Sequence, residues 1–300
     1  MKKSTLASLA ALLGFSIFGF SFLFSKIALE LTTPFVLLSV RFVTAFLVMN
    51  LLVLSGKMKL SLKGKPVFML LLLGLAQPIV YYICENYGIS MTSSSFAGVM
   101  LGIVPVIGLV TGRVFLKERC TAFQVVCAVL SVVGVALTTT GGMGTVSVLG
   151  TILLLAAAVS SSLFSVISRG SSKYFSAFER TYVMFALASV VFTGIALVQN
   201  RQDISALLVP LSVPKFWVAA LYLAVASSVC AFLLINYAMN HISVARAAIF
   251  ANFATVISVP AGILIMRETF EPLQILGIVI IVVSVFGVSL PGKETTNAPT

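Results

Sequence analysis

Charged residues are scarce in this chain, since Asp, Glu, Lys and Arg make up only 9% of its 300 residues. Soluble globular proteins carry about 25%. Hydrophobic residues instead make up 60% of the chain, and the mean hydropathy is +1.15. A transmembrane helix needs about 20 apolar residues, so ten of them with short connections would use most of the length. We therefore expect a polytopic membrane protein with no separate soluble domain and with the lipid bilayer as its main partner.

Residues that bind metals or perform catalysis are equally few. His241 is the only histidine, and the four cysteines form no C-x-x-C motif. This composition excludes a histidine-based zinc cluster and argues against a histidine triad. The run 141–144 is glycine-rich but lacks the Lys-Ser/Thr of a phosphate-binding loop, so we interpret it as a turn. The sequence therefore predicts no cofactor, no metal and no catalytic residues.

Ten apolar segments are separated by charged residues or by clusters of Gly, Pro and Ser. Only helices and closed barrels satisfy their backbone groups in hydrocarbon, and these segments lack the alternation of barrel strands. The chain is thus predicted to be all-α, with ten transmembrane helices. Their approximate limits are 7–29, 34–54, 67–89, 92–115, 122–140, 148–168, 178–199, 215–238, 243–266 and 272–290.

Positive charges are distributed unevenly between the two sides of the predicted helices. With Arg41 inside a span, 14 of the remaining Lys and Arg residues fall on the side of the amino terminus. The other side holds four, namely Lys26, Arg201, Lys215 and Arg267. By the positive-inside rule both termini are cytoplasmic, and we expect a multi-pass protein of a bacterial-type inner (plasma) membrane. The net charge of +11 is assigned to this rule, so no nucleic-acid partner is expected.

An internal repeat divides the chain into two halves. A shift of about 150 residues places Asn86-Tyr87 over Asn236-Tyr237, Glu118 over Glu268 and Gln124 over Gln274. Each half holds five spans, an odd number, so the second copy enters the membrane from the opposite side. We predict a first repeat at 1–143, an inverted second repeat at 144–290 and a disordered cytoplasmic tail at 291–300. Inverted repeats are typical of transporters that work by alternating access.

Several motifs resemble the EamA-type branch of the drug/metabolite transporter superfamily. They are Gly19, Ser21, Lys26, Pro34 and Arg41 in the first two spans, and Pro105-Val106, Glu118, Gln124 and Gly134 in the next three. The resemblance covers about residues 7–290. The second half departs from the pattern, because Thr255-Val256 replaces Pro-Val and Met184 stands where a copy of Arg41 would fall. The resemblance implies a permease, often an exporter, for small metabolites, amino acids or drugs, with a central cavity between the halves.

Arg41 and Glu85 are the ionisable residues placed within predicted spans at similar depth. A charge at the bilayer centre costs about 2.5 to 3.5 kcal/mol on insertion scales, so each needs an explanation. Two hypotheses remain open. The pair is either an outer gate or anchor for a zwitterionic or carboxylate substrate, or a static structural ion pair.

Further candidates for substrate binding follow from helical spacing. The third span carries Gln77, Tyr81 and Glu85 on one face, and Gln77-Pro78 near the midplane predicts a kink. Ser227 is the repeat counterpart of Gln77. The remaining candidates are Ser162, Asn252 and the aromatic residues Phe18, Phe22, Tyr81 and Tyr82.

For each of these candidates an ordinary packing role remains open. Ser94, Gly98 and Gly102 form a small-xxx-small pattern that predicts close helix packing. Glu118 and Glu268 are interpreted as structural ends of their spans. The almost wholly apolar fifth and tenth spans are assigned to the lipid-facing rim.

Three functions are compatible with these observations. The first is a secondary transporter that binds a small-molecule substrate near the midplane. The second is an intramembrane enzyme for lipid-linked substrates that uses Glu85 and Tyr81 as acid/base groups. The third is a membrane sensor or scaffold without transport activity. The sequence indicates neither the substrate, the coupling ion nor the oligomeric state.

Overall fold

The computed structural model describes residues 3–56, 58–116, 121–140, 147–241 and 244–289, and these residues form helices without any strand. Seven helical segments in them are long and apolar enough to cross a membrane, and three shorter apolar helices accompany them. The all-α polytopic fold is thereby confirmed. Glu118, the boundary between residues 143 and 144, the turn at 141–144 and the tail at 291–300 lie outside the described residues.

The two halves of the chain contain corresponding sets of helices. Those of the first half are α1 (Lys3–Leu29), α2 (Pro34–Leu54), α3 (Phe68–Gly74), η1 (Leu75–Val80), α4 (Tyr81–Ser90), α5 (Ser94–Leu101), α6 (Val104–Leu116) and α7 (Ala122–Thr140). Those of the second half are α8 (Val148–Ser171), α9 (Ala177–Gln199), α10 (Ser205–Leu208), η2 (Val209–Ser212), α11 (Pro214–Leu221), η3 (Tyr222–Cys230), α12 (Ala231–His241), α13 (Val244–Ile265) and α14 (Pro272–Ser289).

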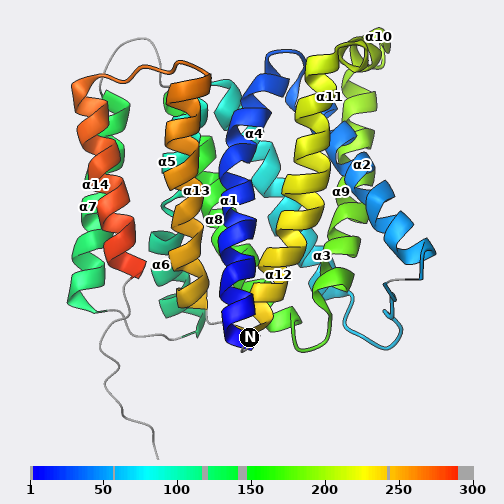
Figure 1. Cartoon of the computed structure of the whole chain (residues 1–300), viewed down its shortest axis with the longest axis horizontal. Helices are drawn as coiled ribbons and strands as arrows, with labels where there is room; N and C mark the ends of the chain where they lie inside the picture. The colour runs from blue at the N-terminus through cyan, green and yellow to red at the C-terminus, as the bar shows by residue number, and fades with distance from the viewer. Residues whose placement is uncertain (1–2, 57, 117–120, 141–146, 242–243, 290–300) are drawn as a thin grey trace, which may run out of the picture.

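The helices stand side by side in one bundle, and the contacts between them follow the repeat (Figure 1). α1 begins and α14 ends at the same end of the bundle, which we call the amino-terminal face. α2 packs against its repeat counterpart α9, α5 against α13, and α7 against α14. The contact of α1 with α12 corresponds to that of α8 with α4. Such paired contacts are expected from two inverted five-helix repeats.

The third span of each half is interrupted by a π-helical turn. η1 separates α3 from α4, and η3 separates α11 from α12, at positions that the 150-residue shift brings together. In η1 the backbone of Gln77 is non-helical, with φ −146° and ψ 120°, and Pro78 follows it. The kink expected at this dipeptide is thus present. The carbonyl oxygen of Ala76 accepts a hydrogen bond from Ser160 Oγ of α8 at 2.6 Å, so the π turn is attached to α8.

α7 and α14 form a pair at one edge of the bundle (Figure 1). Their axes approach closely at Gly134, where an added Cβ would lie 2.7 Å from Ile281 Cγ1 and 2.9 Å from the Gly277 carbonyl oxygen. Small residues allow transmembrane helices to approach in this way. Many large apolar side chains of the pair are exposed, as expected for a lipid-facing rim. They include Phe123, Val126, Val129, Val132, Val133, Ile275, Leu276, Val279 and Val283.

Candidate functional site

Arg41 is one of the two largest fully buried side chains of the described residues, and three neutral hydroxyl groups surround it. It lies in the first half of α2. Its Nε donates to Ser228 Oγ at 2.9 Å, and its Nη2 donates to Tyr82 Oη at 2.9 Å and to Ser227 Oγ at 3.1 Å. The two serines belong to η3, and Tyr82 follows η1 by two residues. Arg41 therefore connects α2 to η3 and to α4, the helix that directly follows η1.

Aromatic rings complete the surroundings of the Arg41 guanidinium. Its Cζ lies 4.2 Å from the centroid of the Tyr82 ring and 5.6 Å from that of Phe42. A guanidinium within about 6 Å of a ring is stabilised by the negative face of the π system. This attraction offsets part of the free energy needed to bury the charge, but it supplies no hydrogen-bond acceptor.

Glu85 is also fully buried, and its hydrogen bonds stay on its own helix, α4. Tyr81 Oη donates to Glu85 Oε1 at 3.3 Å, and Asn86 Nδ2 donates to Glu85 Oε2 at 3.1 Å. The Tyr81 and Tyr82 rings meet edge to face, with centroids 4.8 Å apart. The two tyrosines thus connect the surroundings of Arg41 with those of Glu85.

Arg41 and Glu85 do not form the direct ion pair that the sequence suggested. Among the ion pairs within 4.0 Å in the described ranges, none joins Arg41 to Glu85. The reason is that Arg41 hydrogen-bonds to Tyr82, whereas Glu85 hydrogen-bonds to Tyr81 and Asn86. The two residues are linked through Tyr82 and Tyr81, whose rings are in contact.

The other candidates from the sequence are Gln77, Ser162 and Asn252, and all three are buried. Gln77 is buried at the kink of η1. Ser162 of α8 shares a hydrogen bond of 2.8 Å with Thr111 of α6. Asn252 is buried in α13, which packs against α1 and α5. The structure therefore brings together Arg41, Ser227, Tyr81 and Glu85, whereas the hydrogen bond of Ser162 leads to α6.

The predicted close packing of the fourth span is present. α5 packs against α13, and Thr255 Oγ1 donates to the Gly98 carbonyl oxygen at 2.9 Å. A Cβ added at Gly98 would collide with Ser258, and one added at Gly102 would collide with Thr255. These two glycines therefore have a packing role.

A second fully buried arginine, Arg180, was missed by sequence reasoning. Its Nη1 donates to the Ser168 carbonyl oxygen at 2.6 Å and to Ser168 Oγ at 2.9 Å. Its Nη2 donates to the Asn236 carbonyl oxygen at 3.1 Å and to Asn240 Oδ1 at 2.6 Å. Arg180 thus connects α8, α9 and α12. The repeat gave one signal for this site, because Asn236 is the counterpart of Asn86 and both asparagines are buried.

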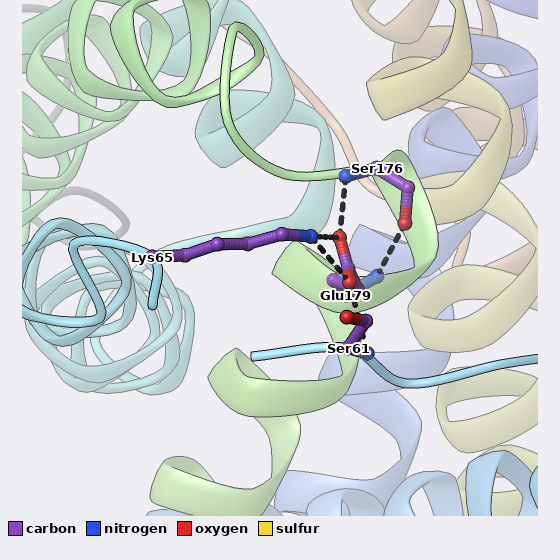
Figure 2. A network of polar contacts seen from close by, with 4 residues as sticks. All are labelled: Ser61, Lys65, Ser176 and Glu179. Carbon is purple, nitrogen blue, oxygen red and sulfur yellow. Dashed lines mark hydrogen bonds and ion pairs between the residues drawn. The ribbon is translucent and has the colours of Figure 1, made fainter. Parts of the chain in front are cut away.

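A third polar network joins the two halves at the amino-terminal face (Figure 2). Glu179, in the first turn of α9, accepts hydrogen bonds from Lys65 Nζ at 2.8 and 2.9 Å and from the Ser61 backbone N–H at 3.0 Å. Together with Ser176 it also forms a capping box. The network fixes the α2–α3 connection to the beginning of α9, so we assign it a structural role.

Comparison with known proteins identifies relatives of the whole chain. The sequence profile of the EamA-like transporter family matches residues 5–140 and again residues 148–290. An uncharacterized transporter of Bacillus subtilis (strain 168), YcxC, is 33% identical over 99% of this chain and 97% of its own length. A second uncharacterized transporter of the same organism, YetK, is 24% identical over 100% of this chain and 91% of its own length.

The fold also has a counterpart among solved structures. One crystal structure matches with a TM-score of 0.66, covering 96% of this chain and 95% of that chain at 18% sequence identity. At this identity the likeness concerns the fold alone.

Proposed function

Because this chain belongs to the EamA-like transporter family and is a membrane transporter, we propose that it is secondary-active and works by alternating access. Its substrate is a small metabolite, an amino acid or a drug-like molecule, and the direction of transport is export from the cytoplasm. Two inverted halves can exchange shapes and so expose a central site first to one side and then to the other.

The contacts of Arg41 with η3 and with Tyr82, which lies just after η1, are the observation that carries this proposal. π turns within α-helices occur frequently at functional sites. Here the two turns are repeat-related, and the cluster beside them contains two buried ionisable residues, Arg41 and Glu85. Intramembrane ionisable residues commonly mark the pathway of a substrate or ion. The buried ionisable residues and the repeat-related π turns thus both support a central site between the halves.

The energy source in this proposal is a gradient of an ion or of a solute. The sequence contains no Gly-x4-Gly-Lys-Ser/Thr motif of the kind that binds ATP phosphates. In this proposal the protein lies in the plasma membrane with both termini in the cytoplasm, and the excess of Lys and Arg on the side of the amino terminus supports this orientation.

Reconstitution of the purified protein in liposomes tests this function. Under an imposed proton or solute gradient, we expect saturable flux of at least one solute from a panel of amino acids, organic acids, nucleobases and cationic drugs. The rim variant Val283→Ala should preserve this flux, because Val283 is exposed on α14 away from the cluster. Flux no greater than that of protein-free liposomes, for every solute and gradient, would contradict the proposal.

A further inference from the structure

The Arg41 guanidinium carries a buried positive charge that lacks an adjacent anion. Its hydrogen-bond partners are the hydroxyl groups of Ser227, Ser228 and Tyr82. No carboxylate oxygen of the described residues lies within 4.0 Å of it, because the ion pairs at that distance involve Lys65 and Lys215. A charge buried among neutral groups is strongly destabilising unless a counter-charge neutralises it.

One nitrogen of the guanidinium also lacks a hydrogen-bond acceptor. Arginine has five N–H donors, and the three on Nε and Nη2 of Arg41 are occupied. Nη1 is buried and has no partner. A buried donor left unpaired on a charged group costs more than a lost neutral hydrogen bond. The free donors of Nη1 and the missing counter-charge therefore indicate the same kind of ligand, an anion with oxygen acceptors.

Glu85 does not fulfil this need, although it is the acidic residue of the same cluster. Both of its oxygens already accept hydrogen bonds within α4, from Tyr81 and Asn86. It forms no ion pair with Arg41 within 4.0 Å, and it leaves Nη1 unpaired.

The environment beyond the hydroxyl groups is aromatic. The Tyr82 ring lies 5.2 Å from Phe42 and 6.5 Å from Phe232, between ring centroids. Phe232 in turn lies 5.6 Å from Phe18 and 5.5 Å from Phe185. A ligand that reaches Arg41 therefore meets apolar ring surface with the rest of its body. This favours an organic anion over a small inorganic one.

We propose that Arg41, with Ser227, Ser228 and Tyr82 holding its guanidinium in place, is the anchor for the carboxylate of a small organic acid with an apolar body. The inference rests on the proposed transport function and specifies the substrate class of that same site. The ligand carboxylate accepts the two N–H groups of Nη1, and charge-assisted bonds of this kind are the stronger ones. The serines of η3 orient the donor, so the anchor contains groups from both halves of the chain.

Ligand-induced thermal stabilisation of the purified full-length protein in detergent tests the anchor. The probes are propionate, hexanoate, benzoate and phenylacetate, each compared with its own amide, together with chloride as an inorganic anion. A ligand that binds only the folded state raises the melting temperature as its concentration increases. We expect at least one carboxylate to raise it saturably in the wild type, and its amide to have no effect.

Variants separate the anchor from a general effect on folding. Arg41→Lys keeps the charge but loses the planar fork, so its affinity for the active carboxylate should fall about tenfold or more. Arg180→Lys is the matched control, because Arg180 is equally buried among neutral partners but belongs to another network. It should lower the melting temperature while keeping the difference between acid and amide. The wild-type comparison remains decisive if Arg41→Lys fails to fold.

The possible outcomes distinguish this inference from the proposed function. Equal effects of acid and amide, stabilisation by chloride alone, no stabilisation by any carboxylate, or an unchanged affinity of Arg41→Lys would each overturn the anchor. Saturable flux of a neutral or cationic solute that carboxylates do not inhibit would overturn the anchor and leave the transport function intact. Carboxylate binding that depends on Arg41, without flux of any solute in liposomes, would do the reverse.

Discussion

Glu268 accepts a hydrogen bond from the backbone N–H of Ser94 at 2.8 Å, although 174 residues separate them in the chain. The same carboxylate accepts from Ser94 Oγ at 2.7 Å and from the Ser95 N–H at 3.0 Å. It thereby satisfies the first free N–H groups of α5 and supplies a negative charge at the positive end of that helix. The carboxyl end of α13 is thus fixed to the amino end of α5, in agreement with the structural role expected for Glu268.

Replacement of this carboxylate should weaken the contact between α5 and α13. We expect Glu268→Ala to lower the free energy of unfolding by about 1–2 kcal/mol, since it removes a helix cap. Glu268→Gln should cost less, because an amide oxygen still accepts but the charge is lost. Thermal unfolding in detergent measures the effect. Glu271→Gln is the matched control, because that acidic residue is exposed and three positions further along. An equal loss in the control would contradict the prediction.

The ion pair between Lys65 and Glu179 should contribute more to stability than the pair between Lys215 and Glu30. The Glu179 side chain is 5% exposed and also caps α9, whereas the Glu30 side chain is 43% exposed. We expect Glu179→Gln to cost about 1–2 kcal/mol, and Glu30→Gln less than about 1 kcal/mol.

Limited proteolysis provides a second measurement on the same two variants. Glu179→Gln should accelerate cleavage within residues 58–66, because the α2–α3 connection loses its attachment to α9. Glu30→Gln should not do so. Identical cleavage in both variants would show that Glu179 does not hold this segment.

The close approach of α7 and α14 predicts that Gly134 tolerates no larger side chain. A Cβ added at this position would lie only 2.7 Å from Ile281 Cγ1. Gly134→Leu should therefore separate the two helices and lower the melting temperature by several degrees. Val133→Leu, one position earlier on the exposed side of α7, should leave the melting temperature nearly unchanged. A stable Gly134→Leu protein would contradict the observed packing of the rim.

The proposed orientation predicts which cysteine variants are labelled from outside the cell. Lys173 lies in the connection that precedes α9 and Arg201 lies beyond its end, and both are exposed. In a background without the native cysteines, an impermeant maleimide should label Arg201→Cys in intact cells. It should label Lys173→Cys only after permeabilisation. Labelling of both from the same side would exclude the proposed topology.

The sequence was sufficient to predict the helices and the repeat, because both depend on apolar segment length and on matching positions. Asn86 and Asn236 illustrate this, since the match found by shifting the chain corresponds to two buried positions in the structure. The rim was predicted for the same reason. Its two helices carry no charged residue, so the exposure of their large apolar side chains agrees with their composition.

The contacts of the candidate site were harder to predict, because they depend on helix rotation and on the backbone at the π turns. No residue pattern around Ser227 predicts the π turn η3, because this segment contains no proline. The sequence places Arg180 among the charges at the membrane surface. Its burial could not be predicted, because its hydrogen bonds to Ser168 and Asn240 depend on how α8 and α12 pack. The pairing of Arg41 with Glu85 was predicted from their similar depth in the membrane. Depth alone does not show that each of the two residues hydrogen-bonds to a tyrosine instead.

The extra residue of a π turn changes the angular position of every side chain that follows it by about 100°. Ser227 and Ser228 lie within η3, where both accept hydrogen bonds from Arg41. Deletion of one residue from η3 would keep the hydropathy of the span almost unchanged and yet turn both hydroxyl groups away from the guanidinium. The recognition of a solute by this chain would then depend on the number of residues along a helix as much as on their identity.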